Sequence, residues 1–228
     1  YRMLGQGDTE GVFQLESSGM KQVLVGLQPQ NLEDIIALIS LYRPGPMDSI
    51  PTYLRNRHEP DKISYKTPQL AHILDVTNGC IVYQEQVMQI FRELAGFSFG
   101  QADNVRRAMS KKKHAVMEAE REHFVHGCTE PGHECPGCVA NGISEKVANE
   151  IYDEMSSFAS YAFNKSHAAC YAYVAFQTAY LKCHYPSEFM AALLTSVLDN
   201  TDKVIEYSGE CCLLYTSDAA DDGESGDL

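Results

Sequence analysis

The helical character of this chain is clearest in the stretch Gln84-Glu-Gln-Val-Met-Gln-Ile-Phe-Arg-Glu-Leu-Ala95, which is followed directly by Gly96. Its apolar residues recur three or four positions apart, the spacing that places side chains on one face of an α-helix. Glycine often follows the last turn of a helix, because it adopts the left-handed backbone conformation without strain. The stretch predicts an amphipathic helix over residues 84–95. The preceding residues 80–83 are compatible with a short strand.

Similar patterns lie on both sides of this stretch. Asn31 is a suitable N-cap for the apolar run that follows, and Arg43-Pro-Gly-Pro46 should end that helix. Further helices are expected over residues 101–126 (one or two), 144–158 and 166–185, and from Pro186 onwards. The segment 166–185 is nearly all apolar, so we expect it to be buried. The chain is therefore predicted to be mainly α, a multi-helix domain with at most a short strand or two.

The composition is that of a globular protein. The chain has 228 residues, of which 44% are hydrophobic and 21% are charged. No apolar run reaches the ~18 residues that span a bilayer, and the start carries no signal-peptide pattern. The eight cysteines are dispersed among helical segments, which favours reduced thiols and a cytoplasmic location. We expect no membrane partner.

The charge is acidic and unevenly distributed. The formal net charge is −13, and residues 208–228 hold six acidic residues and no basic one. Residues 213–228 lose all periodicity, and the segment 208–228 predicts a disordered acidic tail or non-native sequence after a domain over residues 1–207. The remainder is still acidic, which argues against a free-standing nucleic-acid-binding domain. Any phosphate binding must therefore be local.

One basic cluster stands out against this background, because five of the eighteen Lys and Arg residues lie in Arg106-Arg-Ala-Met-Ser-Lys-Lys-Lys113. On a helix, Arg107 and Lys111 are one turn apart, and Arg106 and Lys113 are two turns apart, so both pairs share a face. Like charges at the closer spacing cost roughly 0.2–0.5 kcal/mol. The cluster indicates either a solvated basic face or a site for an anion such as several phosphates.

A second polar group lies in Tyr161-Ala-Phe-Asn-Lys-Ser-His-Ala-Ala169, where Asn164, Lys165 and His167 stand at the start of an apolar helix. Backbone N–H groups at a helix start, with a Lys and a His beside them, favour an anion site. The alternative is a plain N-cap with His167 on the buried side. Two such stretches in one chain favour phosphate recognition.

A loop between two expected helices holds a possible metal site. Its candidate ligands are Cys128, His133, Cys135 and Cys138. The Cys-x2-Cys pair, with a further Cys and a His, could bind Zn²⁺ tetrahedrally. The spacing from Cys128 to Cys135 is loose for such a site, and a surface loop with free thiols is the default interpretation.

Six longer motifs, in order, carry a family resemblance. They are Gly11-Val-Phe-Gln-Leu-Glu-Ser17, Glu33-Asp-Ile-Ile-Ala-Leu-Ile-Ser-Leu-Tyr-Arg-Pro-Gly-Pro-Met47, Ile81-Val-Tyr-Gln-Glu-Gln-Val-Met88, Val105-Arg-Arg-Ala-Met-Ser-Lys-Lys-Lys113, Phe163-Asn-Lys-Ser-His-Ala-Ala169 and Tyr185-Pro-Ser-Glu-Phe-Met-Ala-Ala192. With them the chain resembles the catalytic alpha subunits of bacterial DNA polymerase III, the C-family replicative DNA polymerases. The resemblance covers residues 5–207. Ser110 stands where the family is expected to have glycine.

The resemblance implies that the chain is the fingers domain, a part of a DNA-directed DNA polymerase that binds the incoming dNTP and DNA. Onto this sequence it carries a triphosphate site made of Arg106, Arg107, Asn164, Lys165 and His167. A less definite set for DNA backbone, template or nucleotide contacts is Lys111, Lys112, Lys113, Gln84 and Gln86. For the two glutamines, the alternative is a helix entry that only shapes the domain.

The resemblance also implies that the catalytic residues lie outside this chain. The family's catalytic aspartates belong to a palm domain upstream of Tyr1 and hold Mg²⁺, so Asp8 and Asp34 are not expected to be metal ligands. We therefore expect a fragment with no catalytic residue of its own and no activity alone. Its expected partners are dNTP, primer-template DNA and, through regions mostly absent here, other replicase subunits. The alternatives are a helical protein-interaction module of the replisome and a small zinc-dependent nucleic-acid module.

Overall fold

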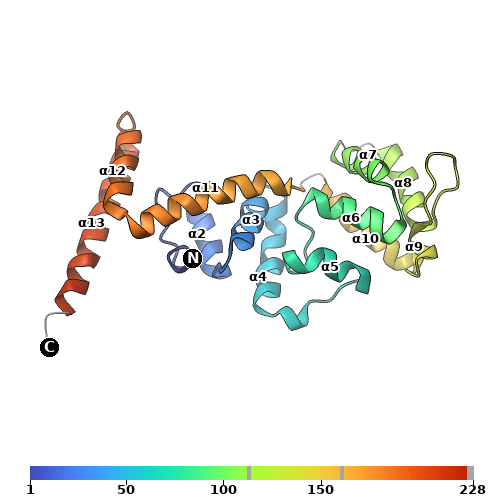
Figure 1. The fold of residues 1–228 in the computed structure, drawn as a ribbon, viewed down its shortest axis with the longest axis horizontal. Coiled ribbons are helices and arrows are strands. Elements are labelled where there is room, and N and C mark those ends of the chain that lie inside the picture. Colours follow the sequence, from blue (N-terminus) through green and yellow to red (C-terminus); the bar gives the residue numbers. More distant parts are fainter. Residues whose placement is uncertain (112–113, 160–161, 225–228) are drawn as a thin grey trace. The chain divides into compact units, whose positions relative to one another are not determined.

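The computed structural model describes residues 1–111, 114–159 and 162–224. Within these ranges every regular element is a helix, and thirteen of them are α-helices (Figure 1). The mainly α fold expected from the sequence is confirmed. No helix in the described ranges is both long and apolar enough to cross a membrane. The chain divides into two compact units, one made of residues 1–34 and 170–228 and the other of residues 35–169.

The unit of residues 35–169 contains the basic cluster and most of the core. Its main helices are α4 (Ile50–His58), α5 (Ala71–Leu74), α6 (Gln84–Ala95), α7 (Phe99–Ser110), α8 (His114–His126), α9 (Gly137–Ala140) and α10 (Glu145–Ala159). Helices α6 to α10 pack on one another (Figure 1). The rings of Phe91, Phe124 and Tyr152 meet at centroid distances of 5.0–6.0 Å in their shared core. This aromatic packing fixes the position of α6 against α8 and α10.

The other unit combines the N-terminal segment with the C-terminal helices. It holds α1 (Arg2–Gly5), α2 (Ser18–Leu27), α12 (Pro186–Ser196) and α13 (Thr201–Glu224), while α3 (Leu32–Leu41) and α11 (Lys165–His184) each have residues in both units. Leu15 and Leu24 are fully buried in its core. Because glycine at position 11 has a φ of +73° and lies under Leu193 of α12, the N-terminal loop can approach that helix closely.

Most of the predicted helix boundaries are confirmed. Helix α6 spans residues 84–95, and Gly96 ends it with the predicted left-handed φ of +74°. The Asn31 Oδ1 atom accepts a hydrogen bond from the Asp34 backbone N–H at 3.0 Å, as an N-cap of α3 should. The basic segment 101–126 forms two helices, α7 and α8.

Two local predictions were wrong. Residues 80–83 form no strand in the described part of the chain, and Tyr83 makes only an isolated bridge to Phe163. Helix α11 is not buried on all sides: its buried stripe is made of alanines, among them Ala172 and Ala175, whereas Tyr173 is 57% exposed. Apolar composition predicted burial here, but burial requires a neighbouring element on every face.

The structure continues α13 through most of the predicted tail, to Glu224. The division into a domain over residues 1–207 and a disordered or non-native segment over residues 208–228 stays a prediction.

Candidate phosphate-binding site

A cavity of about 480 Å³ opens beside the basic cluster, in the unit of residues 35–169. It lies along α6 and α7, with Asn164 contributed by the segment that leads into α11. Its lining residues are Gln84, Glu85, Met88, Gln89, Arg92, Glu93, Phe99, Asp103, Arg106 and Asn164. The cavity therefore combines cations, carboxylates and amides with an apolar side formed by a methionine and a phenylalanine.

On α7, one carboxylate binds both arginines of the cluster. Arg106 donates from Nε and Nη2 to the Asp103 Oδ1 atom, at 3.0 and 2.7 Å, and from Nη1 to the Gln84 Oε1 atom at 2.9 Å. The Nε atom of Arg107 lies 2.7 Å from the Asp103 Oδ2 atom. The hydrogen bond from Arg106, together with the charges of both arginines, lowers the pKa of the Asp103 carboxyl. Asp103 is thus a charged partner of both guanidinium groups.

At the start of α11, a second carboxylate occupies the backbone donors. The Glu85 carboxylate accepts from the Asn164 side chain at 3.0 Å and from the Lys165 backbone N–H at 3.2 Å to each of its oxygens. Asn164 in turn accepts from the His167 N–H at 2.9 Å and caps the helix. The helix start expected from the sequence is present, and a carboxylate from α6 lies on its first N–H group.

The predicted residues are brought together only in part. Arg106 and Asn164, far apart in the sequence, line the same cavity, and Gln84 and Glu85 connect them. The Lys165 ammonium lies 5.3 Å from the centre of the Tyr83 ring.

The other residues of the predicted site are not among those that line the cavity. The Arg107 side chain is 65% exposed, and His167 is exposed with its ring against Phe163. Lys111 is exposed one residue beyond the end of α7, while Lys112 and Lys113 fall outside the described residues.

The two glutamines of the DNA-contact prediction have different positions. Gln84 lines the cavity, donates to the Ala162 carbonyl at 3.0 Å and so ties α6 to the segment before α11. Gln86 is buried, with 4% exposure. It accepts from the N–H groups of residues 82 and 83 and donates to the Ile73 carbonyl and the Thr77 hydroxyl, all at 2.7–3.0 Å. Gln86 therefore organises the entry to α6 through these hydrogen bonds, and its contact with DNA stays a prediction.

The cysteine loop does not gather its four candidate zinc ligands. Cys128 and Cys135 are paired through their backbones at 2.9 Å in both directions, and Cys138 is fully buried in the core of α9. No three of the loop's Cys and His ligand atoms come within 4.8 Å of one another in the described part of the chain, a separation that a tetrahedral site requires. Burial also raises the pKa of the Cys138 thiol to about 12.

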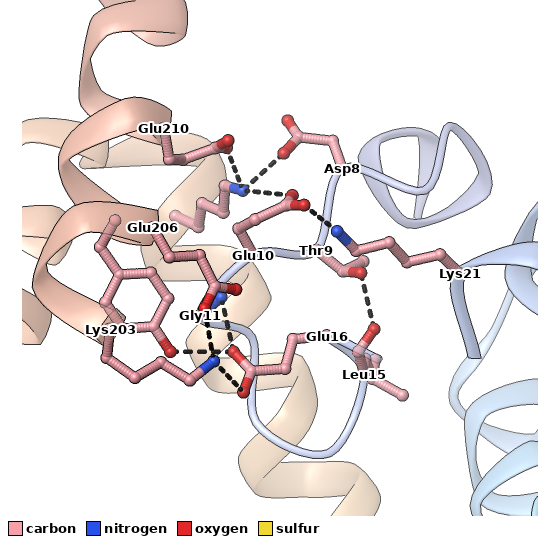
Figure 2. A network of polar contacts seen from close by, with 12 residues as sticks. Asp8, Thr9, Glu10, Gly11, Leu15, Glu16, Lys21, Lys203, Glu206 and Glu210 are labelled. Atoms are coloured by element: carbon pink, nitrogen blue, oxygen red, sulfur yellow. Dashed lines mark hydrogen bonds and ion pairs between the residues drawn. The ribbon is translucent and has the colours of Figure 1, made fainter. Parts of the chain in front are cut away.

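In the other unit, the described residues contain one group of acids close enough to share a cation, formed by Asp8, Glu10 and Glu210 (Figure 2). The cation already present is the Lys182 ammonium, which is hydrogen-bonded to Asp8, lies 2.7 Å from Glu210 Oε1 and is 3.9 Å from Glu10 Oε2. An ammonium in that position neutralises the carboxylates that Mg²⁺ would need. These residues do not fit a catalytic Mg²⁺ site.

Neither carboxylate of the candidate site was predicted from the sequence. Asp103 precedes Arg106 and Arg107 by three and four residues, a helical spacing that brings opposite charges together and could have revealed it. Glu85 carries no such signal, because its contact with Lys165 joins two segments that are far apart in the sequence.

The comparisons with known proteins agree with the motifs. Residues 1–132 match the family of the bacterial DNA polymerase III alpha subunit finger domain. The chain is 50% identical over 212 residues to the DNA polymerase III subunit alpha of Thermus aquaticus, covering 91% of this chain and 17% of that protein. It is 48% identical over 207 residues to the subunit alpha of Bacillus subtilis (strain 168), covering 91% and 18%. The chain spans less than a fifth of the length of these relatives, and it belongs to the DNA polymerase III alpha subunit family, in which it corresponds to the finger domain.

Proposed function

We propose that this chain binds the triphosphate of the incoming dNTP, and neighbouring DNA, as the fingers part of a template-directed DNA polymerase. The triphosphate ligands are Arg106, Arg107, Asn164, Lys165 and His167, and the flanking Lys111, Lys112 and Lys113 contact the DNA backbone. The observation that supports the proposal best is the cavity shared by Arg106 and Asn164, which brings both predicted anion-binding segments to one place.

The chemistry of this cavity suits a polyphosphate. A triphosphate carries about four negative charges, and the pyrophosphate leaving group gains more as its bond to the α-phosphorus breaks. Arg106 presents a planar fork that can bind two phosphate oxygens, and the first N–H groups of α11 point along the positive end of the helix dipole. Arg107, more exposed, can turn towards the same ligand.

In the whole polymerase, the proposed reaction is transfer of a nucleotidyl group from dNTP to the primer 3′ hydroxyl. The proposal assigns Mg²⁺ to palm residues outside this chain, where it would supply charge neutralisation for the attacking and leaving oxygens. The residues described here bind and orient the triphosphate, so their contribution is to positioning and to stabilising the developing charge. Contacts with other replicase subunits are assigned to regions beyond this chain.

Equilibrium titration of the 228-residue chain with a fluorescent dNTP tests the proposal. We expect saturable binding that competes with unlabelled dNTP and with inorganic triphosphate, and that weakens at least tenfold in Arg106→Ala. The matched control is Lys146→Ala, which removes the same charge from an exposed position on α10. Because its effect would be only long-range and screened, it should change the affinity less than twofold.

Two outcomes would contradict the proposal. If Arg106→Ala and Lys146→Ala weaken binding equally, the cavity is not the site. If the chain binds no dNTP but captures a purified replicase subunit, the alternative of a helical protein-interaction module is favoured instead.

A further inference from the structure

We propose that Asp103 and Glu85 are internal counter-anions of the triphosphate site: they occupy its donors in the nucleotide-free protein and are replaced when a polyphosphate binds. This inference rests on the proposed function and assigns two residues that set the affinity of the site. Neither side chain is a phosphate ligand, and both bind the groups that would otherwise bind phosphate.

Asp103 occupies several donors of the two arginines at once. Its two oxygens accept three contacts of 2.7–3.0 Å from Arg106 and Arg107, so one carboxylate holds both arginines of the cluster. Asp103 draws two like charges to one carboxylate and neutralises part of their Coulomb repulsion in the absence of a ligand. A phosphate that binds either guanidinium through its Nε edge must displace this carboxylate.

The contacts of Glu85 are independent of those of Asp103, because they are made at the start of a different helix, α11. The Glu85 carboxylate lies on the Lys165 N–H and the Asn164 amide at 3.0–3.2 Å, where α11 begins. These groups are also where a phosphate would bind at a helix start. Glu85 belongs to the first turn of α6, next to Gln84, the residue that Arg106 contacts. The two counter-anions therefore line one cavity, Glu85 from α6 and Asp103 from α7.

The ion pairs of the carboxylates are weak enough for a polyphosphate to replace them. The Asp103 side chain is 22% exposed and Arg107 is 65% exposed, so water reaches these ion pairs. Ion pairs that water reaches contribute little, about 0.2–1 kcal/mol each, whereas a triphosphate brings about four charges to the same donors. The carboxylates thus lower the affinity of the site for every anion without blocking it. They also aid the release of nucleotide or pyrophosphate, because each carboxylate can return to its donors.

If Asp103 competes with phosphate, replacing it should raise the affinity for triphosphate. Asp103→Asn keeps the shape of the side chain and removes its charge, so the arginines should bind phosphate without competition. We expect inorganic triphosphate and dNTP to bind about 3- to 10-fold more tightly to this variant of the full chain. If Asp103 instead holds the arginines in the orientation that phosphate needs, the same variant would bind less tightly, and the inference would be wrong.

A matched control separates this effect from overall charge. Glu150→Gln removes the same charge from α10, where Glu150 pairs with Lys146 and is not among the residues that line the cavity. It should change triphosphate affinity less than twofold. Equal tightening by Glu150→Gln and Asp103→Asn would overturn the inference.

A second readout requires no ligand. Phenylglyoxal modifies arginine side chains, and mass spectrometry of the digested protein gives the rate at each position. Arg106 and Arg107 should react faster in Asp103→Asn than in the parent, and unchanged rates would show that Asp103 does not restrain them. Glu85→Gln retains an amide oxygen for the Lys165 N–H and should also tighten triphosphate binding, so the proposal stays testable if one variant does not fold.

Failure of this inference can be told apart from failure of the proposed function. If Arg106→Ala abolishes triphosphate binding and Asp103→Asn does not strengthen it, the phosphate site stands and the counter-anion role is rejected. If Arg106→Ala has no effect on triphosphate binding, both are rejected.

Discussion

Arg106 and Arg107 are neighbours in the sequence, yet the structure gives them different surroundings. Arg106 is half-buried and directs three hydrogen bonds at Asp103 and Gln84, whereas Arg107 is mostly in solvent with one contact to Asp103. Arg106 is held by Asp103 and Gln84 when no ligand is bound, whereas Arg107 can turn towards a ligand. A mobile donor can follow charge that develops during the reaction.

We therefore expect Arg107→Ala, in a complete polymerase carrying these residues, to raise the barrier measured by kcat/KM for dNTP by about 2–4 kcal/mol. Arg107→Lys should recover only part of this loss, because the bidentate fork is gone. Lys112→Ala should instead weaken primer-template binding and reduce its salt slope by about one unit. Steady-state kinetics and DNA binding at several salt concentrations measure these effects. Identical dNTP defects and salt slopes for both alanine variants would contradict this division of roles.

Gln86 provides a residue-scale test of stability. Gln86→Ala removes one side chain that bonds four buried groups, leaving two backbone N–H groups without their acceptor. We expect the free energy of unfolding to fall by about 2–4 kcal/mol in urea denaturation. The control is Gln89→Ala on the same helix, whose side chain bonds only through an exposed contact to Glu93. A similar small effect for both variants would show that Gln86 does not organise the entry to α6.

At the scale of elements, close backbone contact determines how the cysteine loop connects α8 to α9. Gly127 and Gly137 both have positive φ, and their backbones touch: a Cβ atom at position 137 would lie 2.3 Å from the Gly127 nitrogen. Only hydrogen atoms fit in that space. The loop is therefore held by its two glycines and by the backbone bridge between Cys128 and Cys135, without a metal cluster of its side chains in the described structure.

Alanine substitution tests that closure. Gly137→Ala should lower the free energy of unfolding by more than about 3 kcal/mol, because backbone strain and a backbone clash add together. Gly132→Ala in the same loop has a similar φ of +86° but open space around it, so only the strain of about 1–2 kcal/mol should appear. Thermal and urea unfolding compare the two. If the two alanines cost the same, close approach of the backbones is not what limits this loop.

The sequence predicted elements better than it predicted their surroundings. Helix α6 was predicted to its last residue, because apolar periodicity and Gly96 are local signals. Burial of α11 was predicted wrongly, because the exposure of Tyr173 depends on which elements cover that face. For the site, the sequence predicted the cations and the helix start, and the cavity brings Arg106 and Asn164 together. It could not predict Glu85, whose contact depends on how α6 and α11 pack.

At the scale of the whole molecule, the net charge of −13 and the local basic cluster have opposite effects on binding to DNA. Overall repulsion opposes nonspecific binding to DNA, so we expect any nucleic-acid contact to depend on the cluster beside the cavity. The chain spans 17–18% of the two relatives compared above.

We predict that the purified 228-residue chain does not extend a primer with any dNTP and divalent metal. The only group of three acids near enough to share an ion, among the described residues, already surrounds the Lys182 ammonium. Gel analysis of a labelled primer-template measures extension. A contaminating host polymerase is excluded by purifying Arg106→Ala in parallel, since contamination would give equal activity in both preparations. Extension by the parent chain alone would contradict the prediction.

Lys182 has a consequence for how this part of the chain responds to its ionic environment. Its ammonium joins the N-terminal loop to α11 and α13 from an almost fully buried position. Lys182→Met should lower the free energy of unfolding by about 3 kcal/mol by leaving three carboxylates together. In urea titrations, millimolar Ca²⁺ should restore part of that loss in the variant and have no effect on the parent. Equal stabilisation of both proteins would show that Lys182 does not take the place of a cation. A tethered lysine thus replaces a dissolved ion, so these helices stay joined whether divalent salt is scarce or plentiful.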